Sequence, residues 1–152
     1  MDIKSYFKTL KLLHLSLVAG LFIFLVITIA QGTGFNTDLK TNATFLYIVP
    51  VVALLGYFGS QFLFKKMVAS IPQSNSFNQK LQRFQSALFV KYALIEVPAF
   101  VALFAYYATG NALPLVIAGC LLAYLAVQGP TKEKLKSSLP LSTEEKRNLD
   151  FK

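Results

Sequence analysis

The stretch KYALIEVPAFVALFAYYATGN, residues 91–111, contains the two features on which the fold depends. Its first part is apolar except for Lys91 and Glu96, and it is long enough to belong to a membrane-spanning helix. It ends in Thr109-Gly110-Asn111, residues that tolerate positive φ in a tight turn. Another apolar run follows at once. The stretch therefore predicts two antiparallel helices joined by this turn.

Further apolar blocks lie on the N-terminal side of this pair. The chain has 152 residues, of which 55% are hydrophobic and 14% charged. A helix needs about 20 apolar residues to cross a bilayer core of about 30 Å. The predicted spans are residues 10–30, 45–64, 84–108 and 112–127. We therefore expect an all-α integral membrane four-helix bundle over residues 1–128, with no second domain between the blocks.

The basic start of the chain also fits the first part of a signal peptide. However, the apolar run that follows Lys11 has about 20 residues, which is longer than the usual signal-peptide core. We therefore interpret residues 10–30 as a retained span.

Basic residues are distributed unevenly among the segments that flank the predicted spans. They gather in the N-terminal tail, in the loop between the second and third spans, and in the tail after the fourth span. In that order they are Lys4, Lys8, Lys11; Lys65, Lys66, Lys80, Arg83; and Lys132, Lys134, Lys136, Lys146, Arg147, Lys152. The loop between the first two spans has only Lys40, which Asp38 offsets. The positive-inside rule then places both termini and the middle loop in the cytoplasm, and we expect the inner membrane of a bacterium.

The formal net charge of +8 is explained by this topology and by attraction to anionic lipid, so we expect no nucleic-acid partner. Residues 129–152 form a polar cytoplasmic tail. Within it, Ser142 and Glu145 have the spacing of a capping box, which predicts a short surface helix over residues 143–149.

Glu96 is the only acid within the predicted spans. If the hydrocarbon begins near Leu88, Glu96 lies about eight residues in, or roughly 12 Å, close to the midplane. A charge there costs about 2.5–3.5 kcal/mol, so we expect Glu96 to face protein and to be protonated at pH 7. Lys91 lies nearer the cytoplasmic surface, and its long stem can reach the headgroups. The hydrogen-bond candidates on the second span are Tyr57, Ser60 and Gln61.

Small residues occur on the other spans near the level of Glu96. They form pairs at the four-residue spacing that lets membrane helices approach closely: Ser16 and Gly20, Gly56 and Ser60, Gly119 and Ala123. On the third span, Pro98 leaves the carbonyl of Leu94 without its helical partner and can bend the helix. We therefore expect narrow packing around the carboxyl group.

Motifs typical of enzymes and metal sites are missing from the sequence. Cys120 and His14 are the only cysteine and histidine, so a disulfide framework or a cysteine-based zinc site cannot form within the chain. The sequence has no GxGxxG, P-loop, HExxH or GxSxG motif. We expect no enzyme activity, no metal and no cofactor.

The segment GSQFLFKKMVASIPQSNSFNQKLQRFQSALFVKYALIEVPAFVALFAYYA, residues 59–108, resembles the proteolipid c subunit of rotary ATP synthases. The resemblance implies a helical hairpin with a cytoplasmic loop at residues 71–76 and a proton-binding carboxylate at Glu96. The family's glycine-rich first helix is reduced here to Gly56 and Gly59, and its Arg-Gln-Pro loop motif is missing. The whole chain also resembles small uncharacterised four-helix membrane proteins of Bacteroidetes.

Two functions remain open on the sequence. One is a proton-binding, proteolipid-like membrane subunit. The other is a non-catalytic accessory or scaffold subunit of a membrane complex, with Glu96 as an internal packing group. A transporter is less favoured, because paired inverted repeats and broken helices are not evident. The expected partners are membrane lipid and either further copies of the chain or other membrane subunits. A carboxyl group enclosed by hydrogen bonds would favour the scaffold.

Overall fold

The computed structural model describes residues 3–32, 34–38 and 43–151, and these contain six helices. The helices are α1 (Ile3–Gln31), α2 (Ala43–Ala69), α3 (Phe77–Thr109), α4 (Ala112–Val127), α5 (Lys132–Ser138) and α6 (Thr143–Phe151). The predicted all-α class is confirmed. Lys40 and Lys152, which were part of the charge assignment, lie outside the described residues.

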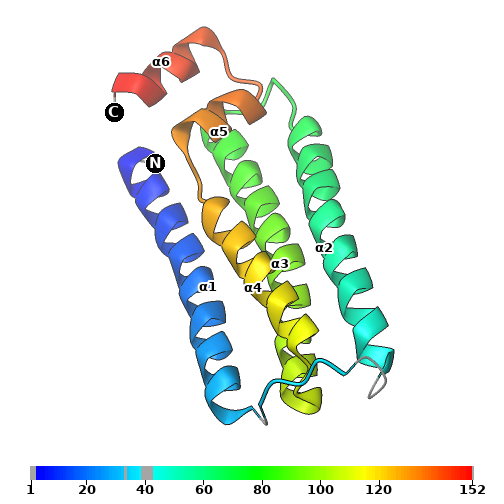
Figure 1. Ribbon diagram of the computed structural model, residues 1–152. Coiled ribbons are helices and arrows are strands. Elements are labelled where there is room, and N and C mark those ends of the chain that lie inside the picture. The colour runs from blue at the N-terminus through cyan, green and yellow to red at the C-terminus, as the bar shows by residue number, and fades with distance from the viewer. Residues whose placement is uncertain (1–2, 33, 39–42, 152) are drawn as a thin grey trace.

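Helices α1 to α4 lie side by side, and consecutive helices run in opposite directions (Figure 1). Helix α3 packs against each of α1, α2 and α4. Helices α1, α2 and α3 are long and apolar enough to cross a membrane, and α4 with α5 would add a fourth span bent by 84°. Length and composition thus indicate a membrane protein. The start of α1, the α2–α3 connection and helices α5 and α6 lie at one end (Figure 1).

Helices α1 and α3 begin about seven residues before the predicted spans. A capping box starts α3: the Ser76 hydroxyl accepts from the Gln79 N–H at 3.4 Å, and the Gln79 side chain accepts from the Ser76 N–H at 3.1 Å. In α1, the buried Tyr6 hydroxyl donates to the carbonyl of Leu81 at 2.8 Å. These first turns are stabilised by capping and packing, which hydropathy alone does not reveal.

The opposite end is organised by the predicted turn between α3 and α4. Gly110 has φ of 66° and caps α3, a conformation that glycine adopts without steric cost. The Asn36 N–H donates to the Gly110 carbonyl at 2.7 Å, and the Ala112 N–H donates to the Asn36 carbonyl at 2.9 Å. The connection after α1 is therefore fixed to the α3–α4 turn by backbone hydrogen bonds.

The polar tail folds over the end that holds the α2–α3 connection. Ser142 and Glu145 form reciprocal bonds of 2.7 and 3.2 Å at the start of α6. The Glu145 carboxylate also accepts from the Lys80 ammonium at 3.0 Å, and the Lys80 side chain is only 4% exposed. Helix α5 was not predicted. It has seven residues, and the Thr131 cap and the buried Leu135 stabilise it.

The core follows the central helix α3. Its fully buried residues include Ile95, Ala99, Ala102 and Leu103. Many large apolar side chains on the outer surfaces are exposed, among them Phe58, Phe62, Phe104 and Val116. Soluble monomers rarely expose an apolar surface of this extent, whereas hydrocarbon solvates it without cost.

Candidate functional site

Glu96 lies on the side of α3 that faces α1. One turn before it, the Tyr92 ring packs against the His14 ring of α1 with centroids 5.1 Å apart. One turn after it, the Phe100 ring packs against Phe24 of α1 at 5.2 Å. Residues four apart share a helix face, so Glu96 lies between two contacts that join α1 to α3.

The Glu96 side chain is half-buried. In the part of the chain that the structure describes, its carboxyl group makes no hydrogen bond and no ion pair. This carboxyl group is therefore free to exchange a proton without first breaking a bond to another side chain.

The residues expected to bond Glu96 make other contacts. The Gln61 amide donates to the Tyr124 hydroxyl of α4 at 3.0 Å, and the Tyr57 and Tyr124 rings lie 4.9 Å apart. The Ser60 hydroxyl donates to the Tyr57 carbonyl at 2.7 Å. Tyr57 and Gln61 thus contact α4, Ser60 bonds its own helix, and within the described ranges none of the three bonds Glu96. The depth of a residue in a span does not reveal how its helix is rotated.

Lys91 is directed to the end of α4. Its ammonium donates to the Gln128 side chain at 2.8 Å and lies 4.9 Å from the centroid of the Phe64 ring. Both contacts stabilise a half-buried cation without a carboxylate. Lys91 is the cation nearest to Glu96 along α3, and these contacts direct its ammonium to Gln128 and Phe64.

A polar cluster surrounds the last turn of α4, where helix carbonyls lack partners within the helix. The buried His14 has its Nε2 2.8 Å from the Leu125 carbonyl; a carbonyl only accepts, so Nε2 carries the hydrogen. The Tyr92 hydroxyl donates to the Gln128 carbonyl at 3.1 Å. We name His14, Lys91, Tyr92 and Gln128 the α4-end cluster. It reaches to within one helical turn of Glu96.

Sequence reasoning missed three members of this cluster. On the sequence alone, His14 is treated only as a possible metal ligand, and no role is assigned to Tyr92 or Gln128. A usable signal was present, because His14 and Gln128 are both polar residues near the end of a predicted apolar span. Such residues seek partners at helix ends.

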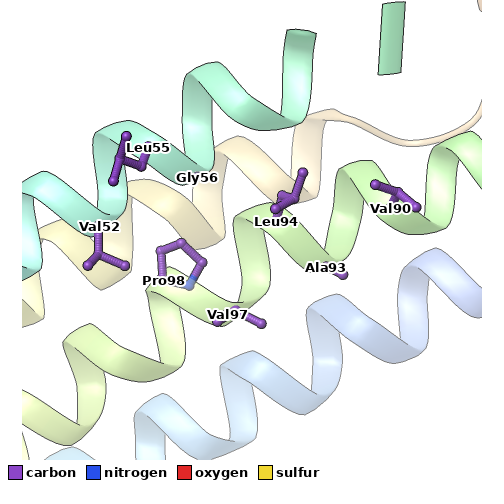
Figure 2. A pocket seen from close by; sticks show the side chains of 8 residues that line it. All are labelled: Val52, Leu55, Gly56, Val90, Ala93, Leu94, Val97 and Pro98. Atoms are coloured by element: carbon purple, nitrogen blue, oxygen red, sulfur yellow. The ribbon is translucent and has the colours of Figure 1, made fainter. Parts of the chain in front are cut away.

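Gly56 makes the close helix contact that was expected of the small residues. A Cβ built there would overlap the Leu94 carbonyl oxygen of α3 and the ring of Pro98 (Figure 2). Pro98 lacks the N–H that the Leu94 carbonyl would accept within the helix, and the backbone of α2 lies against this carbonyl instead.

Four of the other small residues, Ser16, Gly20, Gly119 and Ala123, make no such contact with any described residue, whereas Ser60 is buried. A Cβ at Gly20 or Gly119 would have nothing within 4 Å. Ser16 and Ala123 are exposed, and the Ser16 hydroxyl donates to the Leu12 carbonyl of its own helix. Small residues are frequent in apolar helices, so a four-residue spacing arises on outward faces as well as on packed ones.

The described residues contain no group of three or more His, Cys, Asp or Glu that could hold a metal ion. Cys120 is exposed on α4. The chemistry available near Glu96 is thus proton binding by a carboxyl group, with an imidazole, a phenol and an amide nearby. Comparison with known protein families, with curated proteins and with solved structures finds no match for the chain.

Proposed function

We propose that the chain is a multi-pass membrane protein, built as a four-helix bundle, that binds a proton at Glu96 and takes no part in catalysis. In this proposal both termini lie in the cytoplasm of a bacterium and the bundle spans its inner membrane. The role resembles that of proteolipid subunits, and further copies or other membrane subunits are the proposed partners.

The observation that carries the proposal is the unbonded, half-buried carboxyl group of Glu96 inside a helix that can span a membrane. An ionised carboxylate in such a place needs a cation or several donors to offset the loss of water. Lys91 is engaged with Gln128, Gln61 of α2 with Tyr124 of α4, and Ser60 with a carbonyl of its own helix. The protonated form needs only one acceptor, so it is the form that this environment favours.

The α4-end cluster supplies a route by which protons can reach Glu96. Tyr92 is four residues from Glu96, or about 6 Å along the helix. Its ring touches His14, and its hydroxyl bonds the Gln128 carbonyl at the end of α4. The cluster lies towards the end that holds α5 and α6, the proposed cytoplasmic side (Figure 1).

A scaffold role is the second candidate. Glu96 lies between the His14–Tyr92 contact and the Phe24–Phe100 contact, so a neutral carboxyl side chain there also fills the seam between α1 and α3. In that case the protein would be an accessory subunit, and the charge state of Glu96 would affect packing only.

Infrared difference spectroscopy tests the proton site. We expect a protonated carboxyl band that persists at pH 7, disappears in Glu96→Gln and shifts its titration in His14→Ala. Glu144→Gln is the matched control, because Glu144 is an exposed carboxylate of the polar tail. A carboxylate band from Glu96 that is already complete at pH 5 would refute proton binding. A persistent protonated band together with full cellular activity of Glu96→Gln would favour the scaffold.

Cysteine labelling tests the orientation. In a Cys120→Ala background, a thiol at Asn36 should react with an impermeant reagent added outside intact cells, and a thiol at Ser74 should react only after lysis. Asn36 and Ser74 are both exposed on the surface of the protein. Whether a thiol at either position reacts therefore depends on the side of the membrane on which it lies. The reverse pattern would invert the orientation.

A further inference from the structure

An apolar groove of about 440 Å³ runs along the outer seam between α2 and α3. Figure 2 shows its lining, which comes from both helices and includes Val52, Gly56, Ala93 and Val97. Ala93 contributes little side-chain volume, and the seam is hollow beside the close contact that Gly56 makes with α3. The groove lies within the two helices that can span a membrane, and its lining has no charged side chain.

Two cations lie in line with this groove at its α2–α3 loop end. Val52, Gly59 and Lys66 are spaced by seven residues on α2, so they share one face. Arg83, Val90 and Val97 have the same spacing on α3. Both cations are exposed, and among the described residues neither forms an ion pair.

The register of the two helices brings these cations to a similar level. The rings of Phe64 and Phe84 are 5.9 Å apart, and Lys66 and Arg83 lie within two residues of them. Ten residues separate Gly56 from Lys66, which corresponds to about 15 Å. This distance is about half of a bilayer core of about 30 Å. If Lys66 and Arg83 lie at the level of the lipid headgroups, Gly56 and the groove beside it therefore lie near the midplane of the bilayer.

We propose that this groove is a binding site for an anionic phospholipid, with one acyl chain along the groove and the phosphate between Lys66 and Arg83. The two basic side chains select the anionic headgroup, and the apolar groove selects a lipid over a soluble phosphate. The site requires insertion in a membrane but does not depend on proton binding at Glu96, and the two proposals can fail separately.

Native mass spectrometry of the full chain in mild detergent tests the site, with phosphatidylglycerol and phosphatidylcholine as probes. We expect preferential retention of phosphatidylglycerol. Lys66→Ala and Arg83→Ala should each weaken its binding about fivefold, the usual effect of one cation near an anionic surface. Lys65→Ala is the matched control, because Lys65 is exposed but lies two and a half turns from Gly56, on the other side of α2.

A second pair of variants tests the groove itself. Val97→Phe fills it and should reduce phosphatidylglycerol retention at least as much as Lys66→Ala. Val26→Phe makes the same change on an exposed face of α1 and should leave retention unchanged. Equal retention of the two lipids, equal losses in Lys65→Ala and Lys66→Ala, or full retention in Val97→Phe would each overturn the proposal.

Discussion

Replacing Gly56 with leucine is expected to destabilise the protein by about 3 kcal/mol, the upper end of the usual cost of overpacking. The new side chain would meet the Leu94 carbonyl and the Pro98 ring, and neither can move like the end of a flexible side chain. Helices α2 and α3 would have to separate along their seam. For a chain of this size the midpoint of thermal unfolding in detergent should fall by about 10 °C.

Gly59→Leu is the matched control for this substitution. It lies almost one turn further along α2, and a Cβ there would have nothing within 4 Å. It should leave the unfolding midpoint within about 2 °C of the original, since the gain in helix propensity is small. Equal midpoints for the two variants would show that α2 and α3 do not pack closely at Gly56.

Glu145→Gln is expected to destabilise the end of the molecule that holds α5 and α6 by about 2 kcal/mol. It leaves the Lys80 ammonium, whose side chain is 4% exposed, without its carboxylate. Breaking a fully buried pair costs about 3–5 kcal/mol. The expected loss here is lower, about 2 kcal/mol, because the Glu145 side chain is 18% exposed and water screens the ion pair. Lys80→Met with Glu145→Gln should recover most of the loss, and failure of this rescue would contradict the assignment.

The same pair predicts a loss of stability in acid. Burial alone would raise the pKa of Glu145, but hydrogen bonds from Ser142 and Lys80 and the charge of Lys80 hold that pKa below its usual value. A carboxyl group whose pKa is lowered in the folded state stabilises the fold at every pH above the ordinary glutamate pKa of about 4.3. This stabilisation is lost as the pH falls through the folded-state pKa. Between about pH 6 and pH 3 the parent chain should therefore lose more stability than the Lys80→Met, Glu145→Gln double variant.

The sequence predicted those parts of the fold that depend on local composition. The 109–111 turn, the apolar helices and the Ser142 cap could be predicted because each depends on residues close together in the chain. Helix α5 could not be predicted from local composition. It has only seven mostly polar residues, and the burial of Leu135 against other parts of the chain stabilises it. The first turns of α1 likewise depend on a contact between distant segments, the hydrogen bond from Tyr6 to the Leu81 carbonyl, whereas α3 begins at a local capping box.

Of the candidate site, only the central residue, Glu96, could be predicted from the sequence. A single acid in an apolar helix identifies Glu96 without any knowledge of packing. Its surroundings depend on the rotation of each helix about its axis, which decides whether Tyr57 and Gln61 face α3 or α4. Sequence spacing fixes which residues share a face but not what that face meets. The α4-end cluster joins residues from both ends of the chain, and a reading of each span by itself cannot bring them together.

The contact between Lys80 and Glu145 also affects the order of biosynthesis. The two residues are 65 positions apart, so Lys80 leaves the ribosome well before its partner does. Until the tail is complete, the ammonium has no carboxylate and the end of the helices is uncovered. A chain truncated before Glu145 therefore leaves the Lys80 ammonium without its carboxylate and this end of the helices without its cover.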